Sequence, residues 1–242
     1  MSSLGWEHFW ENQKFSFSAI MKISTAFCAV EMEKFFRWKP TDKILDYGCG
    51  PAFLADYMAT KNISITGADI NKFYIEQSKK KHPESLFIHL TTDIDFNKQT
   101  LDKHLSGDKF DFIILLSISQ YFDSEVELEK VIRMLLSHLD GNGKIILADV
   151  IDPKTSSLKD AISLMLHCFK KGQIIAFIKF MFYLIFSNYR KLSRRVKLLT
   201  LSQQSIHQIA YKNLLDCEKV NGLTIHSSRT SYVLSKKNNT AH

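Results

Sequence analysis

A glycine-rich turn between Ile44 and Leu54 carries the residues best suited to chemistry. The segment reads Ile-Leu-Asp-Tyr-Gly-Cys-Gly-Pro-Ala-Phe-Leu, with Asp46 ahead of Gly48, Cys49 and Gly50. Glycines between an apolar strand and a helix let a ligand approach the backbone closely, and the start of the helix offers free N–H groups to an anionic part of it. The sequence therefore predicts a nucleotide-like ligand at this turn.

Two familiar nucleotide motifs do not fit the turn. A Walker phosphate loop needs Gly-Lys-Ser/Thr after its spaced glycine, and this segment has none. A dinucleotide fingerprint needs a glycine at position 53, where the chain has Phe53. Together with the acidic Asp46 ahead of the first glycine, this mismatch disfavours a pyrophosphate ligand.

The run DYGCGPAFL resembles the first motif of class I S-adenosylmethionine-dependent methyltransferases, whose pattern is acidic-x-Gly-x-Gly-x-Gly. It departs from that pattern at Ala52, whose methyl group we expect to crowd the packing of helix on strand slightly. The resemblance covers residues 44–149 and the end of the chain. It implies S-adenosyl-L-methionine as cofactor, S-adenosyl-L-homocysteine as product, and no metal.

The same resemblance implies further cofactor contacts after the second and third strands. Asp69 ends the second expected strand, where the family's acidic residue hydrogen-bonds the ribose hydroxyls, and Ile70 would flank the adenine. Asp93, with Ile94 beside it, resembles the acidic residue that contacts the adenine amino group. As alternatives, Asp46 and Asp69 are plain strand-end carboxylates, and the neighbouring Asp95 takes the place of Asp93.

Two more regions are expected to contact the cofactor. Ser117 and Gln120 follow the fourth strand, where the family places the methionine portion, although both could simply cap the next segment. Near the N-terminus, Trp10 belongs to a group of aromatic residues that we expect to act as a lid, the alternative being plain core packing. The other members of this group are Trp6, Phe9 and Phe15.

Methyl transfer from a sulfonium is an in-line displacement, so the protein mainly aligns the acceptor, and a base is needed only if the acceptor must lose a proton. The candidate catalytic bases are His167, on the insertion, and Asp149 or Asp152, at the end of the fifth strand. Ligands in open α/β sheets bind beyond the carboxyl ends of the strands, which favours Asp149. Alternatively, Asp149 caps a loop and His167 is an ordinary histidine of a lid or surface.

Missing motifs narrow the class of acceptor. The segment from Ser117 to Phe122 lacks the Asn/Asp-Pro-Pro-aromatic motif of enzymes that methylate base amines, and no Pro-Cys pair of cytosine methyltransferases occurs. The segment instead resembles small-molecule methyltransferases of natural-product pathways. We expect O-methylation of a hydrophobic molecule in a secondary-metabolite or lipid-like pathway, free or bound to an acyl carrier protein. An RNA methyltransferase and a non-catalytic S-adenosylmethionine-binding protein are the alternatives.

Alternating strands and helices position these residues. We expect parallel strands at 43–47, 63–69, 86–90, 110–116 and 144–149, helices at 53–60, 72–81, 125–139 and 204–219, and an edge hairpin at 223–227 and 231–235. This order predicts a Rossmann-like α/β fold with a seven-stranded, mostly parallel sheet and an antiparallel edge hairpin. One domain would comprise an N-terminal helical cap (1–39), the cofactor-binding core (40–153), a helical lid insertion (154–203) and the terminal helix and hairpin (204–236).

The insertion and the charge of the chain bear on its partners. The segment 174–186 is apolar on all sides and has basic residues on both flanks, and the net charge is +7. We expect a lid over a hydrophobic acceptor, with peripheral membrane contact through 170–197 or a homodimer as alternatives, and we do not expect nucleic acid as a partner. Four scattered cysteines and the missing secretory signal pattern predict a cytoplasmic protein without a disulfide framework or a zinc site.

Overall fold

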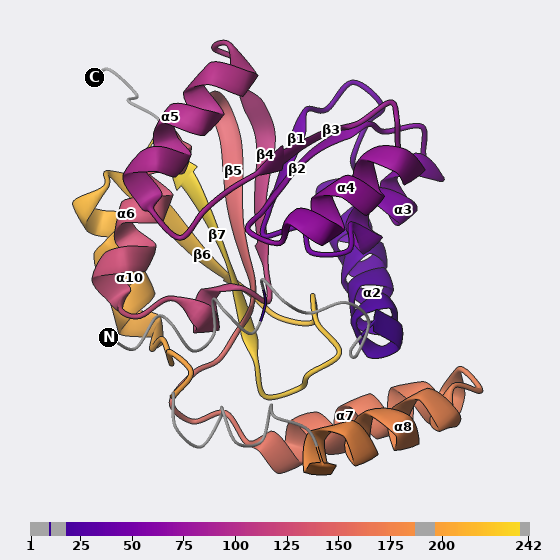
Figure 1. The fold of residues 1–242 in the computed structure, drawn as a ribbon. Coiled ribbons are helices and arrows are strands. Elements are labelled where there is room, and N and C mark those ends of the chain that lie inside the picture. Colours follow the sequence, from indigo (N-terminus) through magenta and orange to yellow (C-terminus); the bar gives the residue numbers. More distant parts are fainter. Residues whose placement is uncertain (1–9, 11–17, 187–196, 238–242) are drawn as a thin grey trace.

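A seven-stranded sheet forms the centre of the fold, with strand order β3-β2-β1-β4-β5-β7-β6 (Figure 1). The computed structural model describes residue 10 and residues 18–186 and 197–237. The strands are β1 (Ile44–Tyr47), β2 (Ile65–Asp69), β3 (Leu86–His89), β4 (Phe110–Leu116), β5 (Leu139–Val150), β6 (Leu215–Val220) and β7 (Thr230–Lys236). Strand β7 is antiparallel to both of its neighbours, and the other pairings are parallel. This confirms the predicted Rossmann-like sheet.

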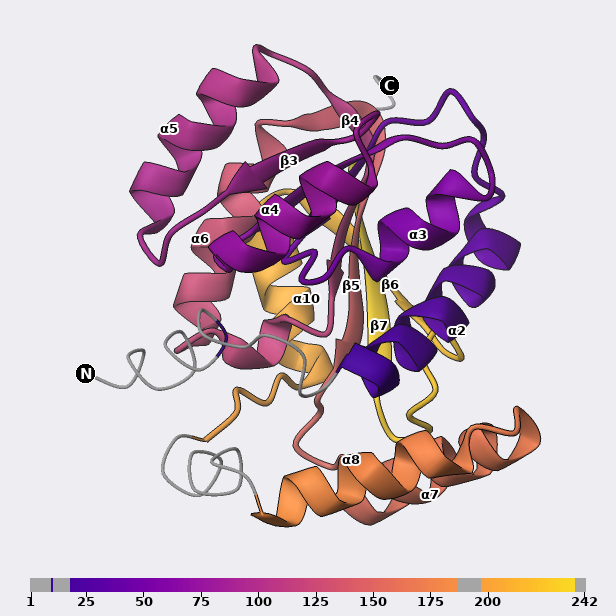
Figure 2. The same cartoon turned by 45° about the vertical axis from the view of Figure 1, so that its right-hand side comes forward.

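Helices cover both faces of the sheet (Figures 1 and 2). One face packs against α5 (Ile94–Leu105), α6 (Glu125–Leu136) and α10 (Gln203–Lys212), and the other against α2 (Ser18–Phe36), α3 (Phe53–Ala59) and α4 (Lys72–Lys81). Successive residues of a strand point to opposite faces, so Ile113 and Leu115 of β4 enter the first core and Ile114 enters the second. A strand buried on both faces reads as a continuous apolar run, which is why β4 was predictable.

The C-terminal elements differ from the prediction. The terminal helix ends at Lys212 and not at Lys219, because Leu214 adopts a left-handed conformation (φ 56°) and the chain then enters β6 at Leu215. The partner of β7 is therefore β6 and not the segment 223–227. That segment belongs to the long β6–β7 loop, which reaches the functional site.

Two further elements were not foreseen in full. Helix α5 begins after Asp93, whose side chain accepts hydrogen bonds from Asp95 N and Phe96 N and so caps the helix. Strand β5 begins at Leu139 rather than Lys144, because Leu139 already pairs with Phe110 at the start of β4. The glycine-containing residues 140–143, which were expected to end a helix, form an irregularity in the strand before the pairing resumes between Lys144 and Phe112.

The insertion forms a helical hairpin of α7 (Ser157–Lys170) and α8 (Ile174–Phe186) beyond the carboxyl ends of the parallel strands (Figures 1 and 2). A small apolar cluster joins it to the body through Leu164 and Cys168 of α7, Ile20 of α2 and Ile225 of the β6–β7 loop. No helix within the described ranges is both long and apolar enough to cross a membrane.

Candidate active site

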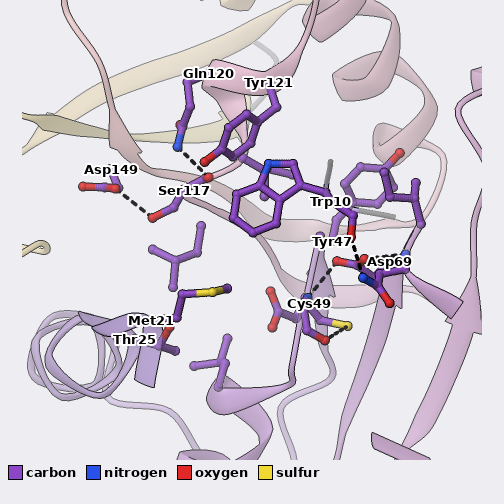
Figure 3. Close-up of a pocket in the computed structure, with 18 of the residues that line it drawn as sticks. Trp10, Met21, Thr25, Tyr47, Cys49, Asp69, Ser117, Gln120, Tyr121 and Asp149 are labelled. Atoms are coloured by element: carbon purple, nitrogen blue, oxygen red, sulfur yellow. Dashed lines mark hydrogen bonds between the residues drawn. The ribbon is translucent and has the colours of Figure 1, made fainter. Parts of the chain in front are cut away.

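A cavity of about 340 Å³ lies at the carboxyl ends of β1, β2, β4 and β5. Most of the residues predicted from the sequence line it, although they come from segments far apart in the chain. The predicted residues in its wall are Trp10, Asp46, Gly48, Cys49, Gly50, Asp69, Ile70, Ile94, Ser117, Gln120 and Asp149. Figure 3 shows Cys49 and Asp69 on one side, Ser117 and Asp149 on the other, and the Trp10 ring between them.

The glycine turn is held against the neighbouring strand by backbone hydrogen bonds. The N–H groups of Gly48 and Cys49 both donate to the carbonyl of Ala68, at 2.7 and 3.1 Å. Gly48 has φ 82°, and a Cβ at this position would lie 2.6 Å from Cγ2 of Ile118. Only glycine satisfies both the left-handed conformation and this close approach.

Ala52, at the position where the family pattern has its third glycine, adopts φ 56° and ψ 38° just before α3. A left-handed conformation costs a residue with a Cβ about 1–2 kcal/mol. The main consequence of having alanine here is therefore backbone strain, rather than the crowding that was predicted from the sequence. The Ala52 side chain is fully buried within the apolar cluster around α2 and α3.

Asp69 ties the end of β2 to the glycine turn. Its Oδ2 accepts from Gly50 N and its Oδ1 from Asn71 N, both at 2.7 Å. Burial raises the pKa of Asp69, and these two hydrogen bonds partly oppose that effect. Each carboxylate oxygen can accept a second hydrogen bond, so Asp69 can still bind hydroxyl donors in the cavity that it lines.

Asp46 is the second carboxyl at this end of the cavity and is buried, with 3% of its surface exposed. Burial, together with the negative charge of Asp69, raises the pKa of Asp46 to about 7. Two carboxyl groups in a poorly solvated site favour a ligand that brings positive charge or hydrogen-bond donors.

Trp10 lies across the cavity. Its backbone carbonyl accepts a hydrogen bond from Asn71 Nδ2, and its ring meets Tyr121 edge-on with 5.2 Å between ring centroids. Figure 3 shows the Trp10 ring between Tyr121 and Asp69. The other predicted lid aromatics, Trp6, Phe9 and Phe15, lie outside the described residues.

At the opposite end, Asp149 is the centre of a buried polar network. Its Oδ2 accepts from Ser117 Oγ at 2.7 Å and from Arg229 Nη1 at 2.6 Å. Arg229 also donates from Nε to Asp160 of α7 at 2.8 Å, so the network links β5, the β6–β7 loop and the lid. Both Ser117 (φ 57°) and Asp149 (φ 66°) are in the left-handed region, a strain typical of functional sites.

Sequence reasoning missed His226 and Arg229, which line the cavity from the β6–β7 loop. Burial lowers the pKa of His226 below its usual value, and so does Arg229, while Asp149 and Asp160 oppose the shift. The predicted edge hairpin of 223–227 and 231–235 concealed their role, because a hairpin at the sheet edge would not have brought His226 and Arg229 to the cavity. No local motif marks either residue.

Two predicted site residues do not reach the cavity. Asp93 is exposed and is engaged as the cap of α5, so Thr91, Thr92 and Asn97 line this part of the wall instead. His167 projects from α7 against Phe27, with ring centroids 5.2 Å apart, and is not part of the cavity wall. The structure therefore places both residues outside the cavity wall, in other contacts than those predicted.

Three buried acceptor atoms in the cavity wall have no hydrogen-bond partner among the described residues: Gln120 Oε1, Asp149 Oδ1 and His226 Nδ1. Leaving such a group unpaired costs about 1–3 kcal/mol, so each indicates a ligand that donates hydrogen bonds. Within the same described ranges, no group of three or more His, Cys, Asp or Glu residues could hold a metal ion.

Residues 39–213 match the sequence model of a family described as "Methyltransferase domain". The match spans most of the chain, and the chain therefore belongs to this family of methyltransferases. With the motif at Asp46–Gly50 in place, it is a methyltransferase of the S-adenosylmethionine-dependent class. No curated protein sequence matches the chain.

Solved structures share the fold at low sequence identity. The plantazolicin methyltransferase BamL, solved with a triazolic desmethylPZN analog and SAH, superposes with a TM-score of 0.57 at 14% identity, covering 97% of this chain and 96% of that one. Magnesium protoporphyrin IX methyltransferase from Synechocystis PCC 6803 with bound SAH gives 0.53 at 15%, covering 95% and 90%. A TehB-like SAM-dependent methyltransferase from Corynebacterium glutamicum gives 0.55 at 14%, covering 87% and 88%.

Proposed function

We propose that the chain transfers the methyl group of S-adenosylmethionine to a hydroxyl oxygen of an apolar small molecule. The observation that carries the proposal is a cavity with the glycine turn and its two carboxyl groups at one end, and with unpartnered acceptor atoms among apolar side chains at the other. The apolar part of the wall includes Ile20, Met21, Leu116, Phe180 and Ile225.

The first end of the cavity fits the cofactor. Asp69 has acceptor capacity left for the ribose hydroxyls, and Gly48 and Gly50 leave room beside the backbone. Asp46 and the unpartnered Gln120 Oε1 suit the positively charged methionine portion. When bound, S-adenosylmethionine supplies a methyl carbon activated by a sulfonium and leaves as a neutral thioether.

At the second end of the cavity, His226 is placed to accept the proton that the acceptor hydroxyl loses. His226 lines the cavity, and its buried Nδ1 has no hydrogen-bond partner among the described residues. In the tautomer that carries the ring proton on Nε2, Nδ1 is a bare acceptor that faces the acceptor hydroxyl. Because its pKa is lowered, the ring is neutral and ready to accept a proton at neutral pH.

In this mechanism, the acceptor hydroxyl gives its proton to His226 Nδ1 while its oxygen forms the bond to the methyl carbon. Bound S-adenosylmethionine would supply the methyl carbon and would keep the electron pair of its carbon–sulfur bond on sulfur. Asp149 is close enough to His226 to raise its pKa, so its negative charge stabilises the imidazolium that forms. Arg229 holds Asp149 in place through a single oxygen, Oδ2, and leaves Oδ1 for the substrate.

The finer expectations about the acceptor are part of the proposal. We infer a free, lipid-like or secondary-metabolic hydroxyl compound, and delivery by an acyl carrier protein stays a prediction. BamL and the magnesium protoporphyrin enzyme are small-molecule methyltransferases by their names, which supports this class of acceptor without identifying it.

Transfer of a labelled methyl group tests the proposal. The chain is incubated with methyl-labelled S-adenosylmethionine and, in separate reactions, with apolar phenols, long-chain alcohols and total RNA. We expect label in a methyl ether of at least one apolar hydroxyl compound, with turnover reduced in His226→Gln and unchanged in His167→Gln. Label in RNA alone would overturn the choice of acceptor, and cofactor binding without transfer to any acceptor would support a non-catalytic protein.

A further inference from the structure

The outer face of the α7–α8 hairpin is unusually apolar. Among the described residues, 16 large hydrophobic side chains are exposed, and nine of them lie on these two helices. They are Leu158, Ile162, Met165, Leu166, Phe169, Ile175, Ile178, Phe182 and Ile185, which we call the hairpin face. With about 200 Å² for a fully exposed large side chain, they expose roughly 1,000 Å², more than monomeric soluble proteins usually show in one patch.

The spacing of these residues makes the face continuous. On α7 they recur every three or four positions from Leu158 to Phe169, and on α8 they do so from Ile175 to Ile185. Residues at this spacing lie on one side of a helix. The two helices pack side by side in both views (Figures 1 and 2). Other residues of each helix lie in the cluster with Ile20 and Ile225, so we infer that the exposed stripes share the side of the lid that faces away from this cluster.

The structure shows whether the apolar helix α8 is buried in the protein or exposed on its surface. A helix that is apolar all round is either buried or meets lipid. None of the described side chains of α8 is buried, although every residue of the helix except Lys179 and Tyr183 is fully apolar. Its inner side, with Phe177 and Phe180, only partly packs on the cluster that joins the lid to the body.

The charges of the hairpin indicate which kind of partner surface fits the hairpin face. Lys159, Lys170, Lys171 and Lys179 are exposed, while its one carboxylate, Asp160, is buried and paired with Arg229. Basic side chains around an apolar face match the interface of an anionic membrane, to which each adds affinity. A symmetric dimer through this face would bring lysines against lysines, which is unfavourable.

We propose that the hairpin face docks the protein on the surface of an anionic lipid bilayer, with α7 and α8 lying in the plane of the interface. Phe180 of α8 lines the cavity, so docking would bring the wall of the active site to the membrane. The further consequence that an apolar acceptor enters from the lipid rests on the proposed function, whereas the docking itself does not.

Vesicle sedimentation tests the docking. The full chain is mixed with vesicles of equimolar phosphatidylcholine and phosphatidylglycerol, or of phosphatidylcholine alone. The test variant is Phe169→Asp/Ile175→Asp, at side chains that are 72% and 67% exposed. The matched control is Val126→Asp/Phe96→Asp, at side chains that are 61% and 52% exposed outside the hairpin.

We expect the wild type and the control to sediment with the anionic vesicles and the hairpin variant to lose at least tenfold in affinity. Lys170→Gln/Lys171→Gln should weaken binding by roughly fivefold per lysine. Calorimetric titration with S-adenosylhomocysteine should give the same affinity for all of these proteins, so that loss of the cofactor site is distinguished from loss of docking. The proposal is overturned if the wild type does not sediment, if both double Asp variants sediment alike, or if the wild type forms a dimer that only the hairpin variant disrupts.

Discussion

Binding of S-adenosylmethionine should expel a proton from Asp46. Burial and the charge of Asp69 raise the pKa of Asp46 to about 7, so the carboxyl is largely protonated in mildly acidic solution. The sulfonium and ammonium groups of the cofactor are positive charges, which favour the ionised carboxylate. The complex therefore favours the ionised carboxylate of Asp46, whereas the ligand-free protein favours the protonated carboxyl below neutral pH.

The size of the effect follows from this pKa. If Asp46 is ionised in the complex, the association constant rises by up to about tenfold per pH unit below about 7 and levels off above it. Between about pH 5 and about pH 7 the gain is roughly 50-fold. S-adenosylhomocysteine lacks the sulfonium charge, so its affinity should rise less steeply.

Isothermal titration in buffers of different ionisation enthalpy counts the protons released. We expect close to one proton per bound S-adenosylmethionine at about pH 5 and almost none above about pH 8. Asp46→Asn should bind with little dependence on pH, whereas Asp93→Asn, outside the cavity, should behave as the wild type. The reasoning is refuted if wild-type affinity is flat over this range or if Asp46→Asn keeps the wild-type slope.

Four further predictions concern stability and turnover. Gly48→Ala should lose about 2–4 kcal/mol of unfolding free energy in urea titration, from left-handed strain and the clash with Ile118; a loss under about 0.5 kcal/mol would contradict the tight turn. Arg229→Met should lose about 3–5 kcal/mol, because two buried carboxylates lose their partner, and Arg229→Met/Asp149→Asn/Asp160→Asn should recover most of it; equal stability of the two variants would contradict the ion network. His226→Gln should lower kcat by about 10²–10⁴-fold at saturating cofactor, and the wild-type kcat should fall with acid only below the usual histidine pKa; an unchanged kcat would exclude His226 as the base. The pKa of Asp46 is higher in the folded state than in the unfolded chain, so the wild type loses stability as the pH rises from the unfolded pKa to about 7. The melting temperature of Asp46→Asn should therefore rise relative to that of the wild type over this pH range. A difference in melting temperature that does not change with pH would refute the pKa shift.

The parts of the fold that could be predicted from the sequence are those with a local signal. Strand β4 is a continuous apolar run, and the glycine turn after β1 combines backbone requirements that few residues other than glycine meet. Asp46 and Asp69 reach the cavity because the carboxyl ends of neighbouring parallel strands meet at one edge of the sheet.

The remaining parts depend on contacts between distant segments. Asp149 and Arg229 are 80 positions apart, and nothing near either residue shows that they pair. Asp93 follows a strand as a ligand-binding carboxylate would, but a helix cap needs the same short acidic side chain, and the helix that it caps was not predicted. His226 entered the site only because β6 lies earlier in the chain than expected.

The most direct test of the cofactor site compares Asp69→Ala with Asp93→Ala in calorimetric titrations with S-adenosylmethionine and S-adenosylhomocysteine. The sequence assigns both carboxylates to the cofactor, but only Asp69 lines the cavity. Asp69→Ala should weaken binding by roughly 1–3 kcal/mol or more, because the ribose hydroxyls lose their acceptor. Asp93→Ala should bind as the wild type does, while losing about 1 kcal/mol of stability from its helix cap. No binding by the wild type, or equal losses in the two variants, would contradict a cofactor site at this cavity.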